Sequence, residues 1–134
     1  MSQSYEDPVF ISLERALEAH LEYFGRDLEC NEQRLDSAVN AAINAWQYEG
    51  ETDLFELAAI YACRISQAHS FADGNKRTAH LVTMGFLNEN GIDSSHFQEK
   101  DLVEWLVDVA KKTINQGQFA RRLRCAAGFA AIAE

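Results

Sequence analysis

The chain has 134 residues, 47% of them hydrophobic, with one proline; this favours one globular domain over residues 1–134 and excludes a disordered chain. The formal net charge of −9 repels phosphate backbones, so we expect no nucleic-acid partner. No apolar run approaches the roughly 20 residues that span a bilayer, and no basic stretch precedes an apolar one at the N-terminus, so we expect a cytoplasmic protein without a membrane partner.

Helical spacing of apolar residues dominates the first half of the chain. Ser12 can cap a first helix that ends at Gly25. The apolar positions of this helix are Leu13, Ala16, Leu17 and Leu21. A second helix is predicted over about 32–48, and residues 24–32 are the one candidate for a short hairpin. The apolar stripe of the second helix is Leu35, Val39, Ala42, Ile43 and Trp46.

The third predicted helix is the most apolar. Asp53 followed by Glu56 has the spacing of a capping box. The helix that follows is rich in alanine, is apolar on more than one side and ends near His69, which predicts a central position. Asp73-Gly74-Asn75 is strong turn chemistry, and a fourth helix is predicted over about 75–90.

Two more amphipathic helices are predicted over about 99–115 and about 118–131, separated at Gly117. The basic cluster at 121–124 is expected to form a solvated or carbonyl-capping helix face. The chain shows no repeat and no linker. These patterns together predict an all-α fold of about six helices in a single domain.

The cysteines give no sign of a disulfide framework or of a zinc site. Cys30, Cys63 and Cys125 are widely spaced, and no two of them have CxxC spacing. We expect reduced thiols, as is usual for a protein of the cytoplasm.

The start of the fourth helix has the chemistry of a phosphate site. A helix N-terminus presents unpaired N–H groups and a partial positive charge, which bind anions. Gly74 would let a phosphate approach the backbone closely. Lys76 and Arg77 add two positive charges, and Arg can bind two phosphate oxygens at once.

Three further residues of the same loop complete a possible catalytic group. Asp73 is suited to hold Mg²⁺ beside bound phosphates, because Mg²⁺ usually takes one or two protein carboxylates plus phosphate oxygens. Histidine is a common general base in enzymes, so His69 can accept a proton from a hydroxyl nucleophile. Phe71 is expected to anchor the loop to the core. Together these residues predict the transfer of a phosphate-containing group from a nucleotide to a hydroxyl.

Each of these residues, taken singly, also has a purely structural interpretation. A histidine at a helix end is often a cap, and Asp-Gly-Asn is often only a turn. Lys76 and Arg77 could simply be solvated. However, two cations at a helix N-terminus are unfavourable next to the helix dipole, which indicates that an anion belongs beside them.

The segment His69-Ser70-Phe71-Ala72-Asp73-Gly74-Asn75-Lys76-Arg77 resembles the signature of the Fic/Doc family, His-x-Phe-x-Asp/Glu-Gly/Ala-Asn-x-Arg, at every fixed position. The Fic branch usually has Gly where this chain has Lys76. Lys at this position resembles the Doc branch, the death-on-curing toxins of bacterial and phage toxin–antitoxin modules. Residues 51–56 and Phe86-Leu87-x-x-Asn90-Gly91 agree with that branch, and the resemblance covers about residues 10–115.

The resemblance implies an all-helical Fic fold with the signature loop between two central helices, and ATP and Mg²⁺ as cofactors. A Doc-like enzyme transfers the terminal phosphate of ATP to a Ser or Thr hydroxyl of a translation factor, with elongation factor Tu as the known type of target, and so stops translation. His69 is then the base, and Asp73 holds Mg²⁺. The nucleotide is held by the remaining signature positions, which are Phe71, Gly74, Asn75, Lys76 and Arg77.

The resemblance also bears on regulation and target binding. Many Fic enzymes carry a self-inhibiting helix with the pattern Ser/Thr-x-x-x-Glu-Gly/Asn. Residues 52–57 and 95–100 have the hydroxyl and the Glu but lack the final Gly or Asn. We therefore expect inhibition in trans by an antitoxin, which would place a helix in a groove near the site. Residues 24–30 correspond to the flap that positions the target peptide, and here they are unusually charged.

Two other functions stay open at this point. A Fic-type enzyme would transfer AMP to the target hydroxyl in place of phosphate, although Lys76 argues against it. A binding-only member of the family would sequester a partner without catalysis, although the complete signature argues against that.

Overall fold

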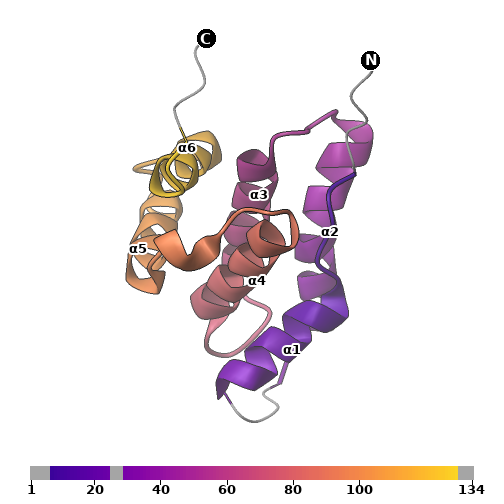
Figure 1. Cartoon of the computed structure of the whole chain (residues 1–134). Helices are drawn as coiled ribbons and strands as arrows, with labels where there is room; N and C mark the ends of the chain where they lie inside the picture. Colours follow the sequence, from indigo (N-terminus) through magenta and orange to yellow (C-terminus); the bar gives the residue numbers. More distant parts are fainter. Residues whose placement is uncertain (1–6, 25–28, 130–134) are drawn as a thin grey trace.

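A computed structural model describes residues 7–24 and 29–129, which fold into helices around one core (Figure 1). The elements in chain order are α1 (Leu13–Phe24), α2 (Glu32–Tyr48), α3 (Leu54–Ala68), α4 (Asn75–Glu89), the 3-10 turn η1 (Ser94–His96), α5 (Glu99–Ala110) and α6 (Gln116–Ala126). No β-strand is formed within these ranges, and the only β-type pairing there is an isolated bridge between Cys30 and Phe71. The predicted all-α class is confirmed.

The core is built around α3, which contacts α2, α4, α5 and α6 (Figure 1). Alanine and other small side chains let these neighbours approach closely, and larger residues fill the space between them. The fully buried large side chains include Leu57, Tyr61 and Ile65 of α3, Phe86 and Leu87 of α4 and Phe119 of α6. The central position predicted for the third helix is therefore correct.

Local hydrogen bonds explain most helix boundaries. Ser12 Oγ accepts from the Arg15 N–H (3.1 Å) where α1 begins. Asp53 caps α3 by accepting from the N–H groups of Phe55 (2.8 Å) and Glu56 (3.1 Å). The predicted capping box is nevertheless wrong, because the Asp53 N–H donates to the Glu51 side chain (3.0 Å).

Two helix ends near the C-terminus differ from prediction. α5 ends at Ala110, and α6 begins at Gln116 after a turn in which Lys112 adopts a left-handed conformation (φ 63°). Asn115 and Gln118 form a full capping box at the start of α6, which places Gly117 inside the helix and not between helices. The helix stops at Ala126, and residues 130 and 131 of the predicted span lie outside the described residues.

Three smaller predictions also need correction. Leu21 is 41% exposed, whereas its neighbour His20 is buried. The basic cluster is not a simple solvated face, because Arg122 pairs with Asp108 (3.3 Å) and Arg124 pairs with Asp53. Residues 25–28 of the predicted hairpin over 24–32 lie outside the described residues, and its two end residues belong to α1 and α2.

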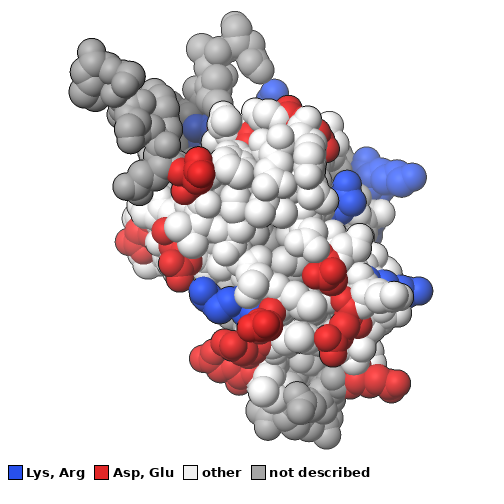
Figure 2. Space-filling view, turned by 90° about the vertical axis from the view of Figure 1, so that its right-hand side faces the viewer, with Lys and Arg blue, Asp and Glu red and all other residues white. Residues whose placement is uncertain are grey.

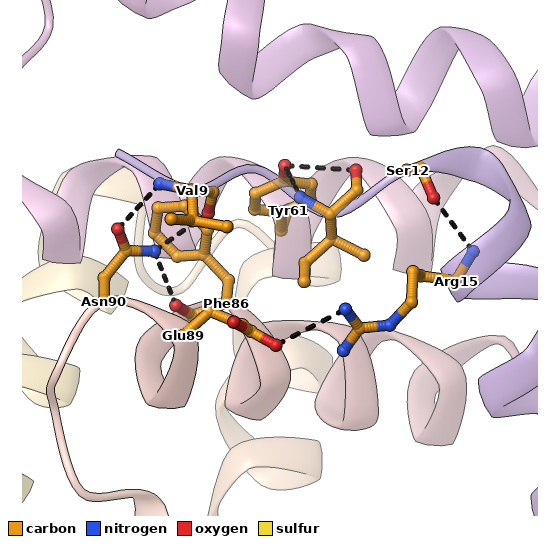
Figure 3. Close-up of polar contacts among 8 residues, drawn as sticks. Val9, Ser12, Arg15, Tyr61, Phe86, Glu89 and Asn90 are labelled. Carbon is orange, nitrogen blue, oxygen red and sulfur yellow. Dashed lines mark hydrogen bonds and ion pairs between the residues drawn. The ribbon is translucent and has the colours of Figure 1, made fainter. Parts of the chain in front are cut away.

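An extended N-terminal segment runs alongside α4 and contacts Tyr61 of α3 (Figure 3). The Ile11 N–H donates to the hydroxyl of the buried Tyr61 (2.9 Å). At the end of α4, the Asn90 carboxamide accepts from the Val9 N–H (2.8 Å) and donates to the Val9 carbonyl (2.9 Å). This pair of hydrogen bonds resembles the pairing between two β-strands and holds the segment against the end of α4. We call this contact the clasp between Val9 and Asn90. Burial raises the pKa of Tyr61 to about 12, so its hydroxyl stays protonated at neutral pH.

Candidate active site

The signature loop joins α3 to α4 through two residues in the left-handed region. His69 closes α3 at φ 50° and ψ 45°, and Gly74 precedes α4 at φ 82°. Left-handed backbone costs roughly 1–2 kcal/mol for a residue with a side chain, so the loop must be held by other contacts.

Those contacts converge on Phe71, whose ring is only 5% exposed. The Asn75 carboxamide accepts from the Phe71 N–H (3.0 Å) and donates to the Phe71 carbonyl (2.8 Å). On the other side, the Asn31 N–H donates to the Ser70 carbonyl (2.7 Å). The expectation that Phe71 anchors the loop to the core is therefore correct, and Asn75 turns out to be its backbone partner.

His20 of α1 packs against the signature loop, a role that the sequence analysis missed. Its ring stacks on Phe71, with centroids 3.6 Å apart and planes within 4°, and also on Phe24 at 4.5 Å. His20 Nε2 donates to the Asp73 carbonyl (3.2 Å). A signal was present in the sequence, because His20 falls on the same helical stripe as Leu13 and Ala16.

Gly74 is required by its surroundings as well as by its backbone. A Cβ atom built on Gly74 would lie 2.2 Å from the Phe24 ring, a distance at which atoms overlap. The space beside Gly74 is thus occupied by an aromatic side chain. The role predicted for Gly74 in phosphate approach stays a prediction, whereas its role in packing is evident.

A cleft of about 1010 Å³ opens above this loop. It brings together six of the seven predicted site residues: His69, Asp73, Gly74, Asn75, Lys76 and Arg77. Phe71 is absent from the lining and lies in the core beneath. Tyr23 and Phe24 of α1 form one wall, and Glu99, Lys100 and Val103 of α5 form another.

The first turn of α4 has the chemistry of an anion site. The Gly74 carbonyl accepts from the Thr78 N–H (2.9 Å), which is the first bond of the helix. The backbone N–H groups of residues 75–77 therefore have no carbonyl partner within α4. Lys76 is half-buried in the cleft wall and adds a positive charge there. These groups would stabilise a phosphate at this end of the helix.

Asp73, the predicted magnesium ligand, is exposed and lines the cleft beside the start of α4. Its Oδ1 accepts from the Gly74 N–H (2.8 Å), which orients the carboxylate at the cleft. No group of three or more His, Cys, Asp or Glu side chains with metal-site geometry occurs among the described residues. The single Asp73 carboxylate fits Mg²⁺ that takes its other ligands from nucleotide phosphates, and it does not fit a metal ion held by protein side chains alone.

Arg77 is already engaged by α5 and α1. Its Nε lies 3.2 Å from Glu99 Oε2, and its guanidinium stacks over the Tyr23 ring at 4.7 Å from the centroid. Both partners are partly exposed, so the ion pair is weak. An arriving phosphate would have to compete with the Glu99 carboxylate for the same guanidinium.

We therefore expect the Glu99→Gln variant to bind Mg-ATP about two- to fivefold more tightly than the unaltered chain, because a competing carboxylate is removed. Isothermal titration with a non-hydrolysable ATP analogue and Mg²⁺ measures this affinity. Glu104→Gln, an exposed change on the same helix, is the matched control and should have no effect. Unchanged or weaker binding by Glu99→Gln would show that Glu99 does not compete with the nucleotide.

Two other histidine positions can now be assigned. His69 is exposed and lines the cleft, and it makes no hydrogen bond to any described residue, so its ring is free to meet a substrate. His80, one turn after Arg77, is half-buried, and burial lowers its pKa. His80 is neutral at pH 7 and belongs to the packing of α4.

The helical fold, with this loop placed at the N-terminus of a central helix, defines a class of protein. The chain belongs to the Fic/DOC family, whose sequence profile matches residues 9–87.

Two Doc proteins are similar to it. The chain is 38% identical over 77 residues to the protein kinase Doc of Escherichia phage P1, a match that covers 58% of this chain and 60% of the phage protein. It is 30% identical over 128 residues to the toxin Doc of Mycolicibacterium smegmatis, which covers 93% of this chain and 96% of that protein. In the first match, the chain spans less than two thirds of its relative.

None of the described helices is both long and apolar enough to cross a bilayer.

Proposed function

We propose that this chain is the toxin of a toxin–antitoxin pair and acts as a protein kinase that uses Mg-ATP. The observation that carries the proposal is the single cleft in which His69 lies beside the cationic first turn of α4. The names of the two Doc relatives, a protein kinase and a toxin, support it. The same proposal places the protein in the cytoplasm, where translation takes place.

In the proposed reaction, the ATP phosphates bind at the α4 N-terminus against Lys76 and Arg77. His69 takes the proton from a Ser or Thr hydroxyl, whose oxygen forms a bond to the terminal phosphorus. The bond from that phosphorus to the bridging oxygen breaks, and ADP leaves with the electron pair. Asp73 would hold Mg²⁺, which neutralises phosphate charge when it is bound.

The alternative function is transfer of AMP, in which the α-phosphorus is attacked and pyrophosphate leaves. The two reactions differ only in which phosphate lies next to the acceptor hydroxyl. Lys76 favours phosphate transfer, because its side chain occupies the wall of the anion site where Fic enzymes usually have glycine. We therefore prefer the protein kinase function.

The Lys76→Gly variant is expected to shift the product from phosphate toward AMP. Removing this side chain widens the anion site and lets the nucleotide bind in the opposite direction. Intact mass spectrometry of the acceptor detects the shift, as a change from about 80 Da to about 329 Da of added mass.

The control for this variant is Lys100→Ala, which removes a positive charge from another wall of the same cleft. It should keep the phosphate product. Glycine near a helix start costs up to about 1 kcal/mol, so circular dichroism must show that the Lys76→Gly variant stays helical. A folded Lys76→Gly variant that adds only phosphate would contradict this explanation of the branch difference.

The function itself is tested by incubating the protein with Mg-ATP and elongation factor Tu, followed by intact mass spectrometry of the factor. A gain of about 80 Da supports the kinase, and a gain of about 329 Da supports the AMP transferase. No gain in mass would remove elongation factor Tu as the target. Co-expression with a candidate antitoxin tests the proposed partner, which should restore growth and bind the toxin in trans.

A further inference from the structure

A second cavity, of about 720 Å³, lies between the first turns of α2 and the last turn of α3. Its larger polar lining residues are Asn31, Gln33, Arg34, Arg64, Gln67 and His69, and the remaining described lining residues are small. We call this cavity the α2–α3 groove. His69 is the one described residue that lines both this groove and the cleft above the signature loop.

That position of His69 decides which molecule can occupy the groove. The base of a group-transfer reaction must touch the acceptor hydroxyl on one side while the nucleotide phosphate lies on the other. The cleft on the α4 side has the phosphate chemistry, with the helix N-terminus and Lys76. The α2–α3 groove, which His69 also lines, is therefore placed to receive the acceptor.

The charge of the groove identifies the kind of acceptor. None of the described residues that line it is acidic, although the chain as a whole has a net charge of −9. On the face drawn in Figure 2, acidic side chains are more widespread than basic ones. A groove with two arginines and no carboxylate among its described lining residues would attract acidic residues.

The two arginines are also uncommitted. Arg15, Arg77, Arg122 and Arg124 each form an ion pair within the described residues. Arg34 and Arg64 are exposed and form none there. The amide side chains of Gln33 and Gln67 beside them can both donate and accept, which suits the backbone of an extended peptide.

We propose that the α2–α3 groove binds the acceptor protein through an acidic segment that flanks the modified Ser or Thr, with Arg34 and Arg64 as the specificity-determining residues. This inference rests on the proposed function of the loop and adds the class of substrate. Arg34 and Arg64 pair with carboxylates of the acceptor, and the hydroxyl between those carboxylates reaches His69. Binding weakens as salt screens these exposed charges.

The test compares the double variant Arg34→Glu/Arg64→Glu with a control of equal charge change, Lys111→Glu/Arg121→Glu, both of whose sites are exposed and outside the groove. In the transfer assay with elongation factor Tu, the groove variant should raise the KM for the factor by about tenfold or more. Its kcat and its KM for ATP should stay near the values of the control. An unchanged KM for the factor, or an equal rise in the KM for ATP, would overturn the proposal.

A binding measurement separates this inference from the kinase proposal. Two fluorescein-labelled eight-residue peptides carry one Thr flanked by Glu or by Lys, and fluorescence anisotropy gives their affinities for the full chain. The Glu peptide should bind more tightly in spite of the acidic net charge, and only the groove variant should lose this preference. That result would support binding of an acidic acceptor segment in the α2–α3 groove even if elongation factor Tu gains no mass. Equal binding of both peptides would overturn the proposal. A preference for the Glu peptide that persists in the groove variant would overturn it as well.

Discussion

Replacing His69 with alanine is expected to lower the rate of group transfer by about 100- to 10,000-fold, because general-base catalysis contributes that much. The ring is exposed and makes no hydrogen bond to any described residue, so little packing is lost with it. The fold should stay intact, and nucleotide binding at the α4 N-terminus should persist. Single-turnover transfer measured by acceptor mass, together with calorimetric binding of an ATP analogue, checks both expectations.

A second variant, His69→Asn, tests whether a loss of transfer comes from the missing base or from a changed loop conformation. His69 has φ 50°, a left-handed backbone that asparagine tolerates better than alanine does. His69→Asn therefore keeps the loop conformation and a side chain of similar reach, but it supplies no base at neutral pH. Both variants should lose transfer and growth inhibition equally. If either one keeps the unaltered rate, another group takes the proton and the role given to His69 is wrong.

The second large effect is on stability. Phe71→Ala is expected to lower the free energy of unfolding by about 3–5 kcal/mol, which is the usual cost of truncating a buried phenylalanine. The total stability of a domain is only about 5–15 kcal/mol, so this loss is large. Phe71 is 5% exposed, and its ring stacks on His20. Alanine can neither fill the space of the ring nor make the stacking contact. Urea denaturation followed by circular dichroism measures the change.

The same variant should also impair the site, because the loop would lose its anchor. Phe129→Ala is a suitable control, since that phenylalanine is 51% exposed and its loss should cost much less. Phe71→Leu retains apolar volume and should fall between the two. A Phe71→Ala protein as stable as the control would show that the loop is held mainly by the Asn75 hydrogen bonds.

The fold was largely predictable because its signals are local and periodic. Helical stripes, caps and glycines lie within a few residues of one another, and they located α2 and α3 closely. The errors arose where two local signals competed. The Asp53 N–H donates to Glu51, whereas the predicted capping box required it to donate to Glu56. At the other position, the capping box of Asn115 starts α6 before Gly117, where a break between helices was expected.

The candidate site was predictable only in part, for a related reason. The loop residues are neighbours in sequence, so their meeting in one cleft followed from a single turn and a helix start. The partners that act on the loop are distant. The helical stripe indicates that His20 is buried, but it does not indicate the partner. The stacking of His20 on Phe71 and the pairing of Glu99 with Arg77 both depend on how separate helices pack.

The clasp between Val9 and Asn90 has a practical consequence for handling the protein. α4 begins with Asn75 at the cleft, and Asn90 caps its other end, so the 15-residue helix separates the two by about 22 Å. Figure 1 shows the N-terminal segment beginning near the top of the molecule and the signature loop in its lower half. A surface tether attached on the N-terminal side of Val9 would therefore leave the cleft facing away from the support, open to nucleotide and to protein partners in immobilised binding assays.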